Sequence, residues 1–405
     1  MRKIPVTGKV FTDEDQQAMV DCIMSGEEIT YGSWNVKFEK MLADYIGVRY
    51  AYFVNSGSSA NLLALSALMS PQLDNWRLIR GDKVITVAAA FPTTVAPIIQ
   101  LGLIPVFVDI DPLTYNIKTE DIEQAISCRT KCIFIAHTLG NPFDVNEIKK
   151  ICQEKNLWLI EDNSDAFGST YDGKKTGSFG HISTSSFYPA HHLTTGQGGA
   201  VFTDNTMLAK ILLSLRNWGK NCVCGPNQDN LCGKRFTQQY GDLPLGYDHK
   251  YVFSEFGYNM QGTNVLAALG CSQLSRIREF TEQRHSNFAD LYTILDEAKL
   301  SIQLPTCHRL AVPSWFGFPI LLNEGINRNK VVAHLESKGI ATRTLFAGNI
   351  LRQPCFTENH NVIYRQIGDL ANTDSIMNRM FWVGCWHGLN ADDMMYIGDT
   401  LKEAL

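Results

Sequence analysis

Short apolar runs alternate with amphipathic helical patterns through the first half of the chain. The runs are rich in β-branched and aromatic residues, as buried strands are, and lie at 50–54, 83–88, 104–110, 131–137, 157–162 and 183–188. Segments such as 59–69 and 145–155 lie between them and repeat their apolar residues at helical spacing. This alternation predicts an α/β fold whose mainly parallel sheet is covered on both faces.

The pattern changes after Thr263, where a helical stretch runs to about Leu300. Its apolar stripe consists of Val265, Leu266, Leu269, Leu274, Ile277 and Phe280. We expect this helix to lead out of a large domain formed by residues 1–300. A strand-like run at 315–322 and a closing helical pattern at 390–405 then predict a smaller α+β domain over residues 301–405.

Composition and charge favour small-molecule partners. The chain has 405 residues, of which 45% are apolar, and its 36 basic and 41 acidic side chains give a net charge of −5. It shows no long run of like charge, no signal-peptide pattern and no apolar stretch of about 18 residues, so we expect a cytoplasmic protein with no nucleic-acid or membrane partner. Eleven cysteines, an odd count, favour free thiols, buried packing or metal ligation over a disulfide framework.

The stretch VNSGSSANLLAL is a candidate phosphate site. It leaves a predicted strand and enters a predicted helix through Gly57, Ser58 and Ser59, so backbone N–H groups and hydroxyls gather at a positive helix end. An ordinary helix N-cap explains the same residues. Ser186 ends another predicted strand, where its hydroxyl either joins the phosphate site or is a plain strand-end serine.

The stretch EDNSDAFGS follows the buried run at 157–160 and supplies a candidate ring-binding carboxylate. Its Asp162 lies at the carboxyl end of a predicted parallel strand, which is the edge where open α/β sheets bind ligands. A carboxylate there is able to pair with a protonated pyridine nitrogen and keep the ring cationic, as an electron sink requires. An acidic helix cap is the alternative interpretation.

Six stretches, taken in order, resemble the DegT/DnrJ/EryC1/StrS sugar aminotransferase-like family, whose members use pyridoxal or pyridoxamine phosphate. They are NSGSSANLLAL, AAAFPTT, HTLGNPFDV, EDNSDAFGS, SFYPAHHLTTGQGG and FGYNMQGTNVLAALG. The resemblance implies the aspartate aminotransferase type of fold and a homodimer with shared active sites. It further implies that the cofactor-binding residues are Gly57, Ser58 and Ser186 at the phosphate, Asp162 at the ring nitrogen, Asp165 near the ring oxygen, Phe91 stacked on the ring, and Asn259 at the phosphate of the neighbouring subunit.

His191 occupies the position at which most of this family has the lysine that forms an imine with the cofactor. Histidine cannot form that imine, but it is able to act as a general base near neutral pH. The change resembles a subgroup, the nucleotide-sugar 3-dehydratases that carry pyridoxamine 5'-phosphate. The resemblance implies that the cofactor's amine condenses with a 4-keto-6-deoxy sugar, that His191 removes a proton from the cofactor's methylene carbon, and that the hydroxyl on sugar carbon 3 leaves. A purely structural histidine is the alternative.

Cys222, Cys224 and Cys232 form a C-x-C-x7-C arrangement in a loop rich in Gly, Asn and Pro, which favours metal ligation over core packing. The spacing, with GYDHKYVFSEFGYN and RTLFAGNILRQPCF, resembles the enzymes that act on cytidine diphosphate 4-keto-6-deoxyglucose. That resemblance implies a [2Fe-2S] cluster reduced by an NAD(P)H-dependent iron-sulfur flavin reductase. The family's fourth cysteine falls at Ser164. Four outcomes stay open: Ser164 ligates, another group such as Asp165 or an exogenous ligand does, no cluster forms, or the thiols hold zinc.

Two further functions compete with reductase-coupled 3-dehydration of a surface-polysaccharide sugar precursor. One is the glutamate-coupled, metal-free version of the same deoxygenation, and the other is a non-catalytic protein that binds a nucleotide sugar. An ordinary sugar aminotransferase is disfavoured because His191 cannot form the imine. Arg343 and Phe346 line the sugar site in the resembling enzymes, although as bare residues they equally suit a surface arginine and a core phenylalanine.

Overall fold

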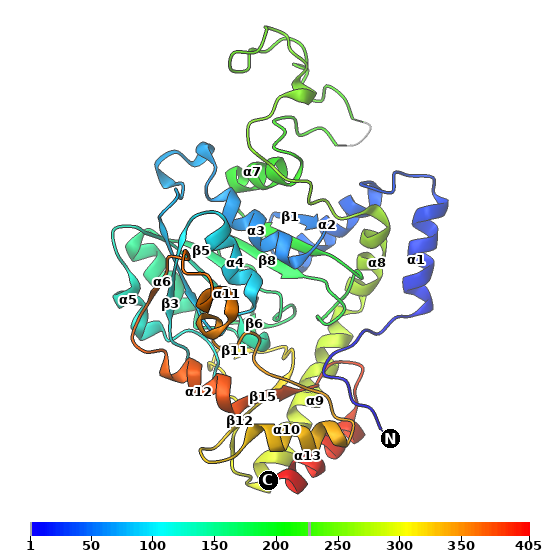
Figure 1. Cartoon of the computed structure of the whole chain (residues 1–405). Helices are drawn as coiled ribbons and strands as arrows, with labels where there is room; N and C mark the ends of the chain where they lie inside the picture. The colour runs from blue at the N-terminus through cyan, green and yellow to red at the C-terminus, as the bar shows by residue number, and fades with distance from the viewer. Residues whose placement is uncertain (1, 226–227) are drawn as a thin grey trace.

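The computed structural model describes residues 2–225 and 228–405, and a large sheet forms its centre (Figure 1). The strands of this sheet lie in the order β1-β9-β8-β5-β4-β2-β3-β14. Their bounds are β1 Tyr50–Val54, β2 Lys83–Val87, β3 Ile104–Val108, β4 Thr130–Ala136, β5 Trp158–Asp162, β8 Ile182–Ser186, β9 Gly199–Thr203 and β14 Arg365–Gln366. All six strands predicted from the apolar runs belong to this sheet.

Most neighbouring strands of the large sheet are parallel. β8, β5, β4, β2, β3 and β14 pair in parallel, whereas β9 is antiparallel to both β1 and β8. The α/β class and the mainly parallel sheet are therefore confirmed. The predicted set lacks β9, because its apolar run GAVFT continues directly from a glycine-rich turn that gives no separate strand signal.

Both faces of the large sheet are buried under helices. On β4, Ile133 and Ile135 belong to one hydrophobic core, which α5 and α6 complete, while Cys132 and Phe134 belong to another core with α3 and α7. Successive side chains of a strand point to opposite faces, so this alternation gives each face its own core. The helices up to residue 216 are α1 Asp13–Met24, α2 Ser33–Ile46, α3 Gly57–Ala67, α4 Pro92–Gln100, α5 Ile122–Ala125, α6 Val145–Lys155 and α7 Thr206–Arg216.

The helical stretch after Thr263 is divided into α8 (Asn264–Ser275) and α9 (Ile277–Ala298). The two meet at Arg276, whose φ of −106° and ψ of 6° interrupt the helix. The expectation of a single helix is therefore wrong at this residue. Figure 1 shows α9 running away from the large sheet, and its Leu291 and Leu295 are buried in a third core.

A second sheet contributes side chains to that third core. Its antiparallel strands lie in the order β10-β12-β15-β13, with bounds β10 Ile302–Gln303, β12 Phe318–Leu322, β15 Met380–Val383 and β13 Thr342–Arg343. The later helices are α10 Arg328–Ser337, α11 Pro354–Thr357, α12 Ala371–Arg379 and α13 Ala391–Ala404. The strand and closing helix predicted in this part of the chain are both present. Of the helices in the described ranges, none combines the length and apolarity that crossing a membrane requires.

Several segments connect the two sheets. The short strand β14 comes late in the chain, yet it pairs with β3 at the edge of the large sheet. Ile4, near the beginning, forms a bridge with Ile340. A small third sheet joins β11 (Ala311–Val312) to β6 (Thr170–Tyr171) and β7 (Lys174–Lys175). Strand pairs therefore join residues on the two sides of residue 300. The domain boundary at residue 300 stays a prediction.

An irregular loop, described over residues 217–225 and 228–263, projects from the body beside α7 (Figure 1, green at the top). In its described part, η4 (His249–Tyr251) is a single turn of 3-10 helix. The three clustered cysteines lie on this loop.

Candidate functional site

A cavity of about 510 Å³ lies at the carboxyl ends of β2, β4, β5 and β8. Parallel strands end at the same edge of a sheet, so their last side chains converge there. The cavity is lined by all of the predicted site residues except Asn259 and the three loop cysteines. The predicted residues that line it are Gly57, Ser58, Phe91, Asp162, Ser164, Asp165, Ser186, His191, Arg343 and Phe346.

The N-terminus of α3 forms one end of this cavity. Ser56 caps the helix by accepting a hydrogen bond from the Ser59 N–H at 3.1 Å. Gly57 packs directly against Ser186, since a Cβ added at Gly57 would meet Ser186 Cβ in a severe clash and lie 2.8 Å from its Oγ. The helix end and the Ser186 hydroxyl therefore face the same space. Backbone N–H groups, a helix dipole and a hydroxyl in one place suit a phosphate.

Asp162, at the end of β5, is held by three hydrogen-bond donors. Asn61 Nδ2 and Thr94 Oγ1 each donate to its Oδ2 at 2.8 Å, and the Ser164 N–H donates to its Oδ1 at 3.1 Å. Thr184 Oγ1 in turn donates to Asn61 Oδ1 at 2.6 Å and fixes the orientation of that amide. An ionised carboxylate only accepts hydrogen bonds, so these three donors suit an ionised Asp162. Asp162 also lines the cavity.

Asp165 and His191 face each other in the buried part of the cavity. The distance from His191 Nδ1 to Asp165 Oδ1 is 3.7 Å, and the two side chains are 15% and 12% exposed. Burial lowers the pKa of His191 to about 4, with the positive charge of Arg284 acting in the same direction and the charge of Asp162 opposing it. Burial, followed by the nearby charge of Asp162, raises the pKa of Asp165 to about 8. Near pH 7 the imidazole is therefore neutral and Asp165 keeps its proton.

The segment 314–316 packs against the two histidines, and its Phe316 ring lies beside the His191 ring. Arg284 is fully buried and its Nη1 donates to the carbonyls of Trp315 at 3.0 Å and Phe316 at 3.2 Å. The Phe316 ring lies 5.2 Å from the His191 ring, centroid to centroid. His192 Nε2 meets the Ser314 carbonyl at 2.8 Å, so this second histidine fixes the turn and does not reach the cavity.

The sequence patterns missed several of these supporting residues. Asn61 lies in NSGSSANLLAL and Thr94 in AAAFPTT. Asn61 could have been found as a polar residue near the start of an otherwise apolar helix. Arg284 gave no comparable signal, since it lies among other charged residues of α9. Only the tertiary structure brings it to the backbone of Trp315 and Phe316, and the Phe316 ring lies against His191.

Phe91 and Phe346 meet at the mouth of the cavity. Their rings are 6.0 Å apart and nearly perpendicular, at 89°, and Phe91 is 53% exposed. Phe346 has a φ of +43°, and the Ile350 N–H next to its turn donates to the Ala88 carbonyl at 3.0 Å. Arg343 is exposed, and its Nη1 donates to the carbonyl of Thr342 at 2.7 Å. This rim combines two aromatic faces with one guanidinium group.

Asn259 lies outside the cavity. It is exposed and forms an antiparallel bridge with Asn217 at the base of the projecting loop. Its predicted reach to a phosphate in a neighbouring subunit involves a second chain and stays a prediction.

The three loop cysteines are also outside the cavity, whereas Ser164 lines it. The thiols lie near one another: the pKa of Cys222 is raised by burial and by the side chains of Cys224 and Cys232, while the Cys224 backbone opposes this. Within residues 2–225 and 228–405, no three His, Cys, Asp or Glu side chains are placed so that they could hold a metal ion as they stand. The structure thus gives no support to a cluster held by these thiols together with Ser164.

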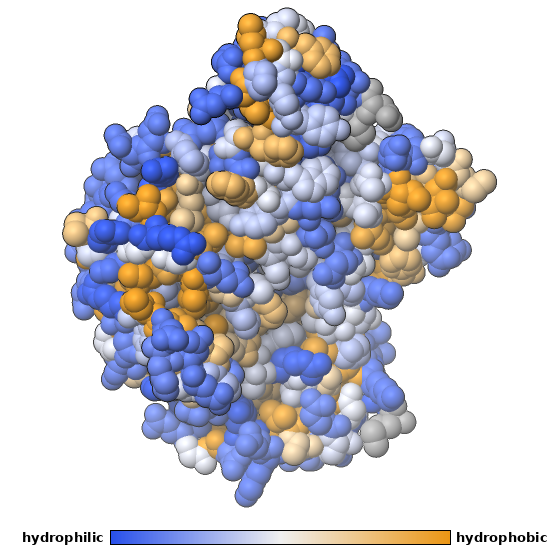
Figure 2. Space-filling model, turned by 45° about the horizontal axis from the view of Figure 1, so that its top comes forward, coloured by the Kyte–Doolittle hydropathy of each residue, from blue (hydrophilic) through white to orange (hydrophobic). Residues whose placement is uncertain are grey.

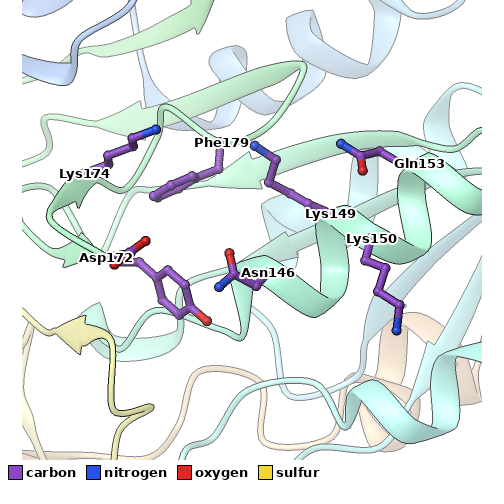
Figure 3. Close-up of a pocket in the computed structure, with 8 residues that line it drawn as sticks. Asn146, Lys149, Lys150, Gln153, Asp172, Lys174 and Phe179 are labelled. Carbon is purple, nitrogen blue, oxygen red and sulfur yellow. The ribbon is translucent and has the colours of Figure 1, made fainter.

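A smaller pocket of about 280 Å³ lies between α6 and the β6-β7 turn (Figure 3). It is lined by Asn146, Lys149, Lys150, Gln153, Tyr171, Asp172, Lys174 and Phe179. Figure 3 shows the amines of Lys149 and Lys150 pointing apart, so they do not converge on one anion. The pocket is lined by no histidine or cysteine, and it contains none of the predicted site residues. The larger cavity is therefore the candidate site.

The sequence pattern of the DegT/DnrJ/EryC1/StrS aminotransferase family matches residues 11–402. The chain belongs to this family. It is 52% identical over 402 residues to the lipopolysaccharide biosynthesis protein RfbH of Salmonella typhimurium, covering 99% of this chain and 91% of the relative. It is 47% identical over 399 residues to the dTDP-4-dehydro-2,6-dideoxy-D-glucose 3-dehydratase of Saccharopolyspora spinosa, covering 98% and 85%.

The fold of this family member is likewise that of solved relatives. GDP-4-keto-6-deoxy-D-mannose-3-dehydratase of E. coli, solved with bound hydrated PLP, superposes with a TM-score of 0.87 at 28% identity. The superposition covers 99% of this chain and 100% of the E. coli chain. The expected aminotransferase-type fold is therefore confirmed.

Proposed function

We propose that this protein is a pyridoxamine 5'-phosphate-dependent nucleotide-sugar 3-dehydratase that removes the carbon-3 hydroxyl of a 4-keto-6-deoxyhexose. The observation that carries the proposal is His191, which stands in the cavity where the resemblance calls for an imine-forming lysine. Two relatives support the assignment, since one is named as a 3-dehydratase and the other as a lipopolysaccharide biosynthesis protein.

The cavity fits a pyridoxamine phosphate group by its own residues. The α3 N-terminus, with Gly57, Ser58 and Ser186, would hold the phosphate, and the donor-surrounded Asp162 would accept the N–H of the ring nitrogen. Phe91 would cover one face of the ring at the mouth. When bound, the cofactor supplies an amine for the sugar's keto group and an electron-withdrawing ring.

His191 would serve as the base. Its burial keeps the imidazole neutral, so a ring nitrogen is free to take a proton from carbon. Asp165, protonated and 3.7 Å away, adds no negative charge that would hold the imidazolium before the reaction. Arg284 positions Phe316 and through it the His191 ring. The same base, once protonated, would donate toward the departing hydroxyl.

We propose cytidine diphosphate 4-keto-6-deoxyglucose as the substrate to test first. Arg343 and Phe346 at the rim provide a cation and an aromatic face, which suit a diphosphate and a planar or sugar ring. The precursor would enter surface polysaccharide, as the name of the Salmonella relative suggests for that protein.

Two routes could complete the deoxygenation. A glutamate-coupled route needs no metal, whereas a reductase-coupled route needs an electron carrier such as a [2Fe-2S] cluster and an NAD(P)H-dependent flavin reductase. We favour the reductase route because three thiols are gathered on one exposed loop, where buried packing cannot explain them.

We propose a homodimer with shared active sites. Figure 2 shows an apolar area over α1, on the right of that view, and Val20, Ile23 and Met24 of this helix are 47%, 57% and 79% exposed. Apolar side chains gathered on one helix favour a covered surface over an open one. A second subunit would also place a partner chain where Asn259 could reach it.

Proton exchange at the cofactor's methylene carbon tests the catalytic assignment. The protein is loaded with pyridoxamine phosphate in deuterated buffer, and loss of the methylene proton is followed by NMR. Exchange should persist below the ordinary histidine pKa of 6.5 and decline only toward pH 4. His191→Asn should abolish exchange and sugar dehydration while it still binds the cofactor. Exchange that survives in His191→Asn would assign the base elsewhere, and a wild-type protein without exchange would be a binding protein.

A further inference from the structure

Arg216, the last residue of α7, forms a buried ion pair with Glu39 of α2. Its side chain is only 1% exposed, and its Nη1 donates to Glu39 Oε1 at 2.5 Å. The Tyr31 hydroxyl donates to the other oxygen, Glu39 Oε2, at 2.9 Å. The ring centres of Tyr31 and Tyr52 each lie 5.2 Å from Cζ of Arg216, so aromatic faces cover the cation. None of these four side chains lines the cofactor cavity.

The pair satisfies both backbone groups of Phe53 on β1. The Phe53 N–H donates to Glu39 Oε1 at 3.0 Å, and the Phe53 carbonyl accepts from Arg216 Nη1 at 2.9 Å. β1 comes first in the strand order of the large sheet, so at this point the ion pair supplies the acceptor and the donor that a further strand would supply. Apolar side chains of the same size would give comparable net stability to a buried ion pair, but they could not bond these two groups. The pair therefore serves to hold β1 in place at Phe53.

Arg216 also holds the following part of the chain, through its backbone. Its carbonyl accepts from the Met260 N–H at 3.1 Å, and the Met260 carbonyl accepts from the Asn55 N–H at 2.9 Å. Asn55 directly precedes Ser56, the N-cap of α3. The helices α2, α3 and α7 all lie beside β1 (Figure 1). Arg216 thus fixes the chain at Phe53 and again at Asn55, just before the helix end that forms the candidate phosphate site.

We propose that Arg216 and Glu39 are positioning residues for the cofactor's phosphate, and that they act through the end of β1 on the N-terminus of α3. Hydrogen bonds from backbone N–H groups to an anion weaken steeply when their distance or angle changes. A shift at Phe53 and Asn55 moves the first N–H groups of α3, whereas Asp162 on β5 keeps its own donors. Loss of the pair should therefore weaken binding of the phosphate and leave binding of the ring unchanged. The inference rests on the proposed function, because it requires the phosphorylated cofactor in this cavity.

The test compares two ligands on the full chain, pyridoxamine 5'-phosphate and pyridoxamine, which has the same ring and amine without the phosphate. Both dissociation constants are measured by titration, and their ratio reports the contribution of the phosphate. The variants are Glu39→Gln, which removes the negative charge at constant shape, Arg216→Met, which removes the cation, and Arg216→Lys, which keeps it. Tyr31→Phe removes only one donor to Glu39, and it is the mild variant that decides the test if the others do not fold.

Asp15→Asn is the matched control. Asp15 of α1 forms another ion pair at 2.5 Å, with Arg276, and its side chain is fully buried. Neither residue lines the cofactor cavity or contacts β1 through a hydrogen bond in the described part of the chain. Asp15→Asn should therefore destabilise the fold, as Glu39→Gln does, without changing the ratio of the two dissociation constants.

Glu39→Gln and Arg216→Met should bind pyridoxamine 5'-phosphate about 10- to 100-fold more weakly than wild type, as for the loss of one hydrogen bond to a charged group. Their affinity for pyridoxamine should stay within about 3-fold of wild type. Arg216→Lys should recover part of the loss, because an ammonium group is still able to donate to Glu39 and to the Phe53 carbonyl. Tyr31→Phe should give a smaller loss of the same kind, about 2- to 5-fold for the phosphorylated ligand alone.

Several results would overturn the positioning role. These are equal losses for both ligands, an unchanged affinity for pyridoxamine 5'-phosphate in Glu39→Gln or Tyr31→Phe, or the same change of ratio in Asp15→Asn. Methylene exchange, measured on the same wild-type preparation, keeps this inference separate from the proposed function. Normal exchange with an unchanged ratio in the variants would reject the positioning role and leave the dehydratase standing. A wild type without exchange would reject the dehydratase, whereas the ratio in the variants decides the positioning role by itself.

Discussion

Thr94→Val should remove one donor from Asp162 while keeping the size and shape of the side chain. Thr94 Oγ1 and Asn61 Nδ2 are both 2.8 Å from the same carboxylate oxygen, and Asp162 is only 4% exposed, so water replaces the lost hydroxyl poorly. A hydrogen bond to a charged group is worth about 1.5–3 kcal/mol. The free energy of unfolding of the cofactor-free protein should fall by that amount.

The assay is urea unfolding of wild type and variant at one protein concentration, since association affects apparent stability. Thr86→Val is the matched control, because Thr86 is buried on β2 and, within the described part of the chain, its Oγ1 has no hydrogen-bond partner. The control should be neutral or slightly stabilising. Saturating pyridoxamine phosphate should restore part of the loss in Thr94→Val, since the ring N–H gives Asp162 a new donor. A loss below about 0.5 kcal/mol, or one equal to that of Thr86→Val, would refute the reasoning.

Three further predictions follow from the cavity. Gly57→Ala places a methyl group 2.8 Å from Ser186 Oγ and 3.0 Å from its Cα, so cofactor affinity should fall roughly 10- to 100-fold by titration, as for about 1.4–3 kcal/mol of steric strain, and unchanged affinity would contradict the phosphate site. His191→Lys should form a covalent imine with pyridoxal phosphate, and borohydride reduction followed by mass spectrometry should find the adduct on residue 191; free aldehyde alone would count against the position. The free energy of unfolding of Asp165→Asn should rise relative to that of wild type as pH rises. The Asp165 carboxyl has a pKa of about 8 in the folded protein and an ordinary pKa of 3.8, so it contributes stability at low pH that is lost as pH rises through about 8. A pH-independent difference in unfolding free energy would show that Asp165 is not buried in its protonated form.

Much of the fold was predictable because buried strands and helices leave local periodicity in the sequence. The strand ends carry the chemistry, so Gly57, Asp162, Ser186 and His191 could be placed at one sheet edge once the strands were taken as parallel. The resemblance to the family then supplied their roles. The break at Arg276 and the strand β9 were missed, because both depend on packing partners that the local pattern does not reveal.

The sequence by itself determined the fold class and the positions of the strand ends, because both leave local patterns in the chain, and the family resemblance marked His191 as standing where most members have lysine. Only the tertiary structure decided which side chains support them. Asn61 and Thr94, from two different helices, both donate to the Asp162 carboxylate. Arg284, from a third helix, donates to the Trp315 carbonyl in the segment that packs against His191. It also placed Ser164 in the lining of the cavity and the three loop cysteines outside it. Contacts between segments that are remote in sequence depend on how the cores pack, and no spacing along the chain encodes them.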